Sequence, residues 1–279
     1  MRYREYAPPP PLDEQLACVW TLTGASDPAD VAEPVVPDGC AEIVLNLADP
    51  FTHVHGDTAE RQPLAMVVGQ MTGPLSLRPG RRVRVVGIRL LPWSGYRVLG
   101  VPMAELRDAF VPVELVLPGL RELHEALAGR SEGSWAPTTF AWLARRLGSE
   151  PPGRIARAAV RLLGRRQGRA SVAEIAAALH VSARSVQRAM HLDVGMPPVT
   201  FARILRVQRA IRRIRELERP TLGRVAVEAG YYDHAHFCRD FREFTGLAPS
   251  ELLAGRRPLT EAFLDGDPRV VEEPPERRA

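Results

Sequence analysis

The sequence contains no lysine, only three cysteines in 279 residues, and 6% aromatic residues. Cys18, Cys40 and Cys238 are odd in number and far apart, which excludes a disulfide framework and a four-cysteine zinc site. No apolar run approaches the ~18 residues that span a bilayer, and the first ten residues, MRYREYAPPP, lack the apolar stretch of a signal peptide. We therefore expect a cytoplasmic protein with no membrane partner.

Charge is distributed unevenly along the chain, although the net charge is only +4. Residues 153–257 hold 20 Arg against 9 Asp and Glu, a balance of +11, so the rest of the chain carries −7. A basic segment beside an acidic one indicates a nucleic-acid-binding domain joined to a region that does not touch nucleic acid. A solvated helical face would give the same excess, so charge alone does not decide.

The pattern of apolar residues divides the chain into a β-rich and a helical part. Length predicts two domains, and 45% hydrophobic with 25% charged residues is ordinary for a globular protein. Short β-branched runs bounded by Pro, Gly and Asp are typical of barrels and sandwiches. They occur at 42–48, 64–71, 74–80 and 82–91. A helical pattern at 95–110 interrupts them, although Gly100 and Pro102 break its first part.

Beyond residue 120 the apolar period becomes helical. Residues 120–130 and 137–148 read as amphipathic helices, followed by a joint at 149–153. The predicted fold class is α+β, with a β-rich amino-terminal domain, a cupin-like barrel or sandwich, and an all-α carboxyl-terminal domain. We expect four segments: a sensing or dimerisation domain (1–118), a helical linker (119–152), a DNA-binding domain (153–257) and a polar, disordered tail (258–279).

Two stretches of the basic segment repeat each other. Seven positions of the first stretch have a counterpart 51 residues later in the second. In the first stretch they are Ser182, Val186, Arg188, Met190, Gly195, Pro198 and Phe201. In the same order, their counterparts are Asp233, Phe237, Arg239, Phe241, Gly246, Pro249 and Leu252. Upstream, Ile175 and Ala176 correspond to Val225 and Ala226 at an offset of 50, so one residue is inserted in the second turn. Such self-similarity indicates a duplicated helix-turn-helix, with units at 171–191 and 222–243.

The first unit has the features of a DNA-recognition motif. Its first helix, 172–179, is apolar on one face, and Ser182 is a good N-cap for the next helix because its oxygen accepts an orphan backbone N–H. On that next helix Arg184, Gln187 and Arg188 share the exposed face at i, i+3 and i+4. Arginine matches guanine and glutamine matches adenine in the major groove, so we predict base reading by these three residues. A solvated polar face is the alternative for each residue taken singly.

The second unit is poorer in base-reading side chains. Asp233 is its N-cap, and three phenylalanines form an inward stripe. The positions equivalent to the first triad are Ala235, Cys238 and Arg239, with His234 and His236 beside them. We expect these five residues to contact DNA mainly through Arg239, one histidine and phosphate contacts. Packing or capping is an equal alternative for the histidines, and metal binding lacks a third ligand.

A single helix is predicted between the units, at 198–218. A helix of ~18 residues is ~27 Å long, and with the offsets of the units it would place the recognition helices about one DNA turn, ~34 Å, apart. Its five arginines, Arg203, Arg206, Arg209, Arg212 and Arg213, do not all fit on one DNA-facing surface. Some are therefore expected to pair with Glu216, Glu218 or acids of neighbouring helices.

Particular motifs of this segment resemble those of the AraC/XylS transcriptional regulators. They are S-x-R-x-x-Q-R at 182–188, G-x-x-P-x-x-F at 195–201, R-x-x-x-A at 206–210, G-Y at 230–231, D-x-A-H-F-x-R-D-F at 233–241 and G-L-x-P at 246–249. The resemblance covers about 154–254. It implies a sequence-specific, non-enzymatic DNA-binding regulator without cofactor. It also implies base reading by positions matched here by Arg184, Gln187, Arg188, His234, Ala235, Cys238 and Arg239. Two departures are Met190, where an aromatic residue is usual, and Ala235, where serine is common.

The front part is similar to the β-rich domain of some regulators of this type, through VVPDGCAEIVLNL at 35–47 and VVGIRLLP at 85–92. In the family such domains commonly sense a small molecule, mediate dimerisation, or do both, so a small-molecule effector and a homodimer partner are expected. The family resemblance as a whole implies promoter or operator DNA as a partner, and RNA polymerase is a further expected partner. This resemblance also implies association with the nucleoid when the protein is bound to DNA.

Two rival functions stay open at this stage. One is a metal-binding, cupin-like enzyme domain fused to a DNA-binding domain, since His53, His55 and Glu60 have the spacing of part of a cupin metal box. The surrounding residues 49–63 read as an exposed loop, which favours no metal. The other rival is an adaptor whose helix-turn-helix pair contacts protein.

Overall fold

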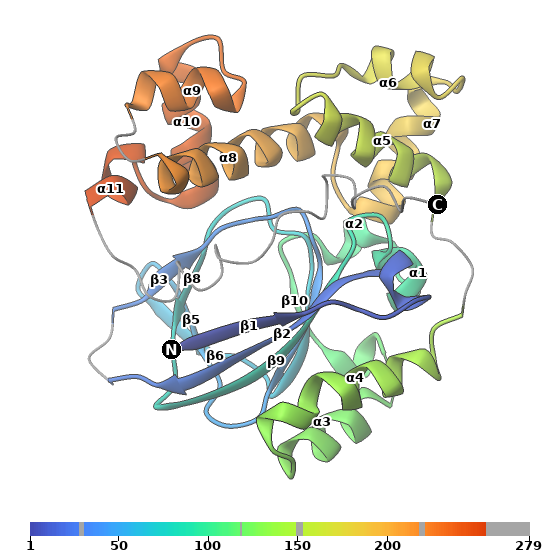
Figure 1. Cartoon of the computed structure of the whole chain (residues 1–279), viewed down its shortest axis with the longest axis vertical. Coiled ribbons are helices and arrows are strands. Elements are labelled where there is room, and N and C mark those ends of the chain that lie inside the picture. Colours follow the sequence, from blue (N-terminus) through green and yellow to red (C-terminus); the bar gives the residue numbers. More distant parts are fainter. Residues whose placement is uncertain (28–30, 118, 149–152, 218–220, 255–279) are drawn as a thin grey trace.

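The amino-terminal region is built of two antiparallel sheets. The computed structural model describes residues 1–27, 31–117, 119–148, 153–217 and 221–254. The larger sheet has the order β1 (Arg2–Tyr6), β2 (Leu16–Ala25), β9 (Arg82–Leu90), β4 (Glu42–Asn46), β7 (Ala65–Val68) and β10 (Phe110–Pro112). The smaller sheet has the order β3 (Glu33–Val35), β8 (Leu75–Arg78), β5 (Thr52–His55) and β6 (Thr58–Arg61). The β-rich region predicted from the sequence is present (Figure 1).

Alternation along the strands gives the larger sheet two buried faces. One face packs on helices through residues such as Val19, Ile43 and Ile88. The other packs toward the smaller sheet, where Trp20 meets Leu75 and Leu77 in one apolar cluster. Trp20 lies opposite Gly87 in the β2–β9 register, and a Cβ at Gly87 would come within 1.9 Å of the indole ring. Glycine is therefore required there for the tryptophan to lie flat on the sheet.

The prediction of a loop at residues 49–63 is wrong, because this segment contains the hairpin of β5 and β6. Thr52, Val54 and Thr58 supply the β-branched residues of the strands, and Gly56 turns the chain with φ 55°. The polar residues that resembled a loop are exposed along β6 rather than irregular.

Four short helices and three single 3₁₀ turns complete this region. The pattern at 95–110 forms α1 (Gly95–Leu99) and α2 (Met103–Leu106), separated by Gly100 at φ 71° and by Pro102, as predicted. The two amphipathic helices predicted next are α3 (Leu120–Ala128) and α4 (Trp135–Ala144). The 3₁₀ turns are η1 (Leu12–Glu14), η2 (Val113–Leu115) and η3 (Glu132–Ser134). Both α3 and α4 share an apolar core with the larger sheet, so they belong to the same packed body as the strands.

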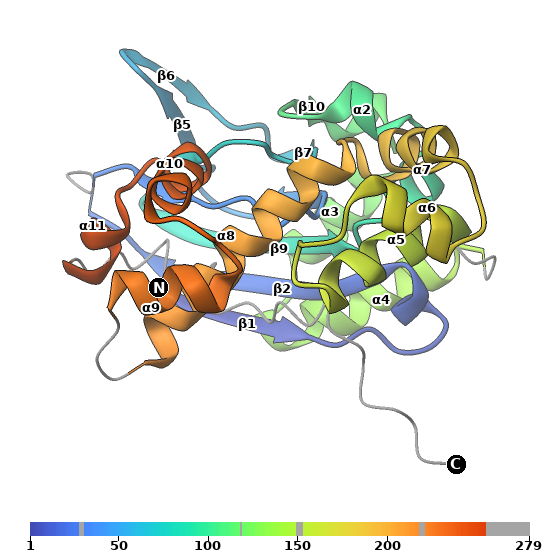
Figure 2. The same cartoon turned by 90° about the horizontal axis from the view of Figure 1, so that it is seen from above.

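The carboxyl-terminal region is all helical, as predicted. It contains α5 (Arg154–Arg165), α6 (Val172–Ala178), α7 (Ala183–Ala189), η4 (Met190–Val194), α8 (Pro198–Glu216), α9 (Leu222–Ala229), α10 (His234–Thr245) and α11 (Pro249–Ala254). The single helix predicted between the units is α8, of 19 residues. Figures 1 and 2 show α6 and α7 at one end of α8 and α9 and α10 at the other. The predicted tail, 258–279, and residues 149–152 of the predicted joint lie outside the described residues.

The two regions are packed against each other. Leu91 and Trp93, which follow β9, belong to the apolar core of the helical region. Gln208 Nε2 on α8 donates to the Pro37 carbonyl at 2.6 Å, and Arg157 on α5 pairs with Glu14 at 2.6 Å. Within the described residues, no helix is both long and apolar enough to cross a bilayer.

Candidate nucleic-acid interface

The two helix-turn-helix units share the same turn geometry. Val181 N donates to the Ala176 carbonyl at 3.0 Å in the first, and Tyr231 N donates to the Ala226 carbonyl at 2.9 Å in the second. The residue before each donor has a left-handed backbone conformation. It is His180 with φ 53° in the first unit and Gly230 with φ 98° in the second. Glycine adopts that conformation freely and histidine is among the residues that tolerate it. The duplication inferred from sequence is therefore also a duplication of backbone structure.

The residue inserted into the second turn is Tyr232. Up to Tyr231 the two turns match hydrogen bond for hydrogen bond at an offset of 50, and from the N-cap Asp233 onward they match at 51. Tyr232 is 96% exposed, immediately before the second recognition helix. It was not among the predicted site residues, although aligning the two copies locates it.

The first unit is rigidly capped on both helices. Ser171 and Glu174 form a reciprocal capping box at the start of α6, and Ser182 Oγ accepts the Ser185 N–H at 3.0 Å at the start of α7. Val186 on α7 is fully buried in the helical core. The predicted N-cap at Ser182 is thus present, and it fixes the orientation of α7.

The three base-reading candidates of the first unit lie together on α7. Arg184, Gln187 and Arg188 are all exposed, on the face opposite the buried Val186. Neither guanidinium is buried against protein, which is the geometry that an interface with DNA requires. The exposed helix surface carries two bidentate cations and an amide within about one turn.

The second unit exposes a smaller share of its DNA-contact candidates than the first. Asp233 Oδ1 accepts the His236 N–H at 2.7 Å, which is the predicted N-cap of α10. Three of the five DNA-contact candidates are exposed and two are half-buried. The exposed ones are His234, Ala235 and Arg239, and the half-buried ones are His236 and Cys238. The predicted inward stripe of Phe237, Phe241 and Phe244 is confirmed, since all three are buried.

The two half-buried candidates make contacts within the protein. His236 Nε2 lies 3.4 Å from an Asp240 carboxylate oxygen, and its ring packs edge-on against Tyr231. Cys238 packs against the helical core, and its Sγ lies 3.5 Å from His234 Nδ1. These contacts favour a packing role for His236 and leave Arg239 as the exposed arginine among the five candidates.

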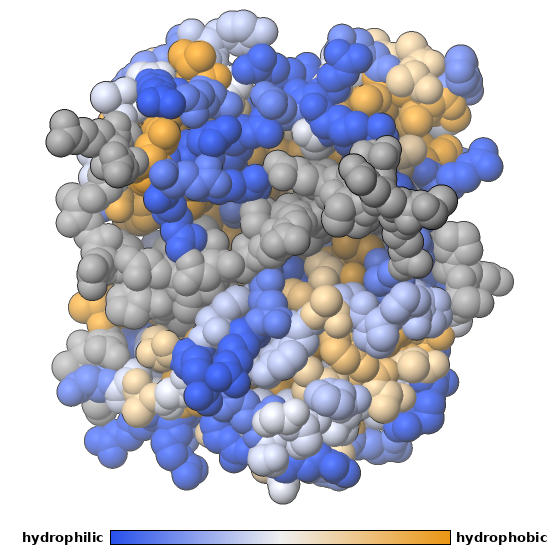
Figure 3. Space-filling view, in the orientation of Figure 1, coloured by the Kyte–Doolittle hydropathy of each residue, from blue (hydrophilic) through white to orange (hydrophobic). Residues whose placement is uncertain are grey.

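Ion pairs anchor α10 to α8. Arg203 donates to Asp240 Oδ1 from Nε at 3.1 Å and from Nη2 at 2.8 Å, and it also pairs with Glu243. Arg206 lies 3.7 Å from the same buried aspartate. Arg213 pairs with Glu216 at 2.9 Å, which was one of the pairings predicted for this helix. Hydrophilic side chains gather over α8 in the space-filling view (Figure 3).

The weak metal candidates lie on the β5–β6 hairpin. His53 is registered opposite Glu60, and the His53 and His55 rings are 6.3 Å apart between centroids. Burial lowers the pKa of His53, the nearby His55 lowers it further, and Glu60 opposes both. Within the described part of the chain, no group of three or more His, Cys, Asp or Glu is placed to hold a metal ion. The structure thus gives no support to the metal-binding alternative.

Two family models match this chain. A helix-turn-helix domain family matches residues 175–255, and a domain of unknown function (DUF6597) matches residues 4–112. An uncharacterized HTH-type transcriptional regulator of Haemophilus influenzae is 28% identical over 98 residues, which are 35% of this chain and 33% of that protein. The chain therefore spans about a third of the length of this curated relative.

The solved structures that match this chain include regulators. A probable AraC family transcriptional regulator from Rhodopseudomonas palustris is 27% identical, with a TM-score of 0.35 over 38% of this chain and 100% of that chain. ToxT from Vibrio cholerae is 10% identical, with a TM-score of 0.49 over 85% of this chain and 98% of that chain.

Proposed function

The chain carries an AraC-type helix-turn-helix domain, which makes it a member of the AraC/XylS family, and on that premise we propose how it regulates transcription. It binds promoter DNA through two recognition helices, and α7 supplies most of the base discrimination. The observation that carries this proposal is the exposure of Arg184, Gln187 and Arg188 on a capped helix whose opposite face is buried. Arginine donates to guanine O6 and N7, and glutamine pairs with adenine, when a helix lies in the major groove.

The second recognition helix contributes fewer base contacts and more contacts to the backbone. Arg239 is the exposed arginine among the predicted contacts of α10, and His234 and Ala235 are exposed on the same helix. Tyr232, exposed beside the N-cap, has a hydroxyl able to donate to a phosphate oxygen. With α8 between them, the two helices enter successive major grooves on one side of the duplex, about one turn apart.

The amino-terminal region is proposed to regulate this binding. We expect a small-molecule effector, self-association, or both to act there, and RNA polymerase to be a partner of the DNA-bound protein. The cupin-like shape, the four-segment division of the chain and the cytoplasmic location remain predictions. No catalytic residue is assigned.

Selection of bound sequences from random duplex DNA by the full chain tests the proposal. The expected result is an enriched site with two motifs whose centres lie about 10 base pairs apart. Failure to enrich any sequence above the input library would overturn it.

Salt dependence separates the proposal from the adaptor alternative. Neutralising several phosphates makes log K fall steeply with log[salt], whereas an apolar protein contact hardly responds. We expect a steep negative slope for binding to the selected duplex. A flat salt response, together with no sequence preference, would favour the adaptor.

A further inference from the structure

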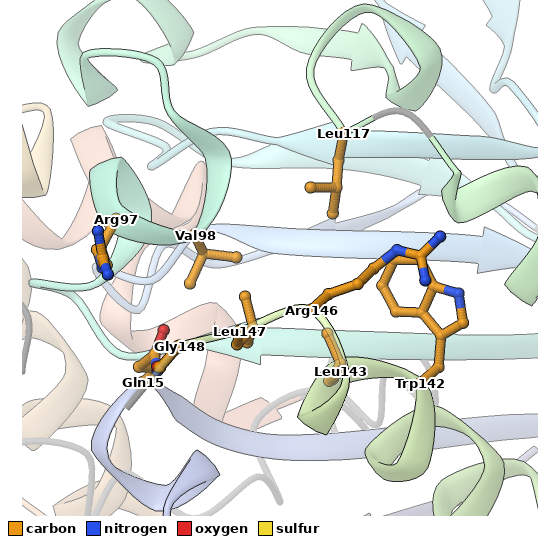
Figure 4. A pocket seen from close by; sticks show the side chains of 9 residues that line it. All are labelled: Gln15, Arg97, Val98, Leu117, Trp142, Leu143, Arg146, Leu147 and Gly148. Atoms are coloured by element: carbon orange, nitrogen blue, oxygen red, sulfur yellow. The ribbon is translucent and has the colours of Figure 1, made fainter. Parts of the chain in front are cut away.

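A cavity lies in the amino-terminal region, close to the joint with the helical region. Its volume is about 220 Å³, smaller than the ~300 Å³ at which drug-sized sites begin, so it suits a small metabolite-sized molecule. It is lined by residues of α1, of α4 and the segment that follows it, and by one residue each from the segments after η1 and η2 (Figure 4). They are Gln15, Arg97, Val98, Leu117, Trp142, Leu143, Arg146, Leu147 and Gly148.

Positive charge stands at both ends of this cavity. In Figure 4 Arg97 lies at one end beside Gln15 and Gly148, and the Arg146 guanidinium lies at the other beside Trp142. The apolar lining residues lie between the two ends. Among the described residues that line the cavity, no side chain is acidic. Two guanidinium groups separated by an apolar wall match an anion at each end of an aliphatic chain.

At one end of the cavity the Arg146 guanidinium is held by an aromatic side chain. The guanidinium stacks over the Trp142 ring at 4.1 Å, which fixes its plane. Trp142 is 4% exposed, and its Nε1 has no hydrogen-bond partner within the described residues. In Figure 4 this nitrogen lies on the side of the indole away from the other lining residues, so the six-membered ring of Trp142 forms the apolar wall at this end. The competing anion is Glu122, 3.3 Å from Arg146 Nη2 and 74% exposed.

Three of the elements around the cavity also hold the first DNA-binding unit. Helix α1, which supplies Arg97, contacts η4 at the end of the recognition helix. Gln15 follows Glu14, which pairs with Arg157 on α5. Gly148 lies six residues before the start of α5 at Arg154. A ligand in the cavity therefore touches the segments that set where the first unit sits relative to the amino-terminal region.

We infer that this cavity is an effector site for a short aliphatic dicarboxylate. One carboxylate pairs with Arg146, the other pairs with Arg97, and the chain lies on Val98 and Leu147. That such a ligand alters DNA binding rests on the proposed function, but that it binds does not.

Calorimetric titration of the full chain, without DNA, tests binding directly. Three six-carbon probes separate charge from apolar contact: adipate with two carboxylates, hexanoate with one, and 1,6-hexanediol with none. We expect adipate to bind about tenfold more tightly than hexanoate, because each charge-assisted hydrogen bond to a carboxylate contributes about that factor. Hexanediol should show no binding. Equal binding of the diol and the diacid, or no adipate binding at all, would overturn the proposal.

Substitutions with opposite expected effects separate binding from misfolding. Arg97→Gln and Arg146→Gln should each weaken adipate binding about tenfold. Glu122→Gln should strengthen it severalfold, since it removes the anion that competes for Arg146, and a damaged fold does not produce a gain. Arg121→Gln, an exposed neighbour on α3 that pairs with Glu125, is the matched control and should change nothing. An unchanged affinity in both Arg97→Gln and Arg146→Gln would contradict the site.

The regulatory part is measured separately, as the affinity for the selected duplex with and without saturating adipate. We expect at least a threefold change, lost in Arg146→Gln. If adipate binds but leaves DNA affinity unchanged, the cavity is a ligand site without the inferred coupling. If no duplex is selected at all, the proposed function fails while the titration result stands.

Discussion

The two helix-turn-helix units share the geometry of their turns but differ in where a buried acid lies. Asp240 in the second unit stands where the first has Ala189, and Asp193, just after the first unit, stands where Phe244 follows the second. Both carboxylates are at most 8% exposed. Asp240 faces the arginines of α8, whereas Asp193 lies on η4, the segment that contacts α1 and α2 of the amino-terminal region.

The two units are therefore attached to the rest of the molecule by different contacts. The second unit is anchored to α8 by a buried ion-pair cluster, and one of its predicted DNA contacts, His236, is drawn toward that cluster. The first unit keeps all three base-reading candidates exposed and is held instead against the amino-terminal region. We therefore expect the first unit to discriminate bases and to respond to conformational changes of the amino-terminal region. We expect the second unit to position the protein on the DNA.

The largest effect is expected from Asp240→Ala. Removing this carboxylate leaves Arg203 and Arg206, both largely buried, without their shared partner, and we expect the free energy of unfolding to fall by about 3 kcal/mol. Urea denaturation followed by circular dichroism measures the change. Glu243→Ala is the matched control, since it pairs with the same Arg203 but is 48% exposed, and it should cost less than about 1 kcal/mol. Equal costs would show that the cluster is not the anchor of the second unit.

Arg184→Ala and Arg188→Ala should weaken binding to the selected duplex by between about 1 and 3 kcal/mol each and relax base preference in one half-site. The reason is the loss of bidentate donors to base edges. Titration of labelled duplexes measures both effects. Arg239→Ala should cost less than either, with a lower salt slope as its main signature. If Arg239→Ala proved the most damaging of the three, the assigned roles of the units would be reversed.

Asp193 is expected to make stability fall as pH rises. Burial raises the pKa of its carboxyl to about 6, above the value in the unfolded chain, so folding binds a proton. This stabilisation is complete at low pH and is lost as pH rises through about 6. In Asp193→Asn, the fall in unfolding free energy between pH 4 and 7 should be smaller by about 1 to 2 kcal/mol. Denaturation at a series of pH values measures it. An unchanged pH profile would mean that the aspartate is not desolvated at the boundary with the amino-terminal region.

The smallest effects are expected from the N-caps. Ser182→Ala and Asp233→Ala each remove one acceptor for an orphan N–H at the start of a recognition helix, at a cost of about 1 kcal/mol in unfolding free energy. Thermal unfolding compares the two. Ser182→Asp should restore stability, because aspartate is an equally good N-cap and occupies the equivalent position of the second unit. A Ser182→Asp variant as unstable as Ser182→Ala would contradict the capping role.

The helical half was largely predictable because its information is local. The period of apolar residues located α8, the N-caps Ser182 and Asp233 located the recognition helices, and the two copies confirmed each other. Aligning the two copies also places the single inserted residue of the second turn, and the hydrogen bonds of the two turns confirm that it is Tyr232.

The amino-terminal half was less predictable because its contacts are long-range. Strand β2 was not among the runs singled out, since Thr and Gly interrupt its apolar residues. The sequence of the β5–β6 hairpin resembles a loop because its polar residues are exposed strand residues. No spacing of residues in the sequence predicts the cavity, because its lining residues Gln15, Arg97 and Arg146 come from distant parts of the chain.

The division of roles between the two units is tested most directly by a binding scan over every single-base variant of the selected duplex. The account predicts penalties of about 1 to 3 kcal/mol concentrated in the half-site whose preference Arg184→Ala and Arg188→Ala relax, with smaller penalties in the half-site that α10 contacts. Equal penalties in the two half-sites, or larger ones in the half-site of α10, would contradict it.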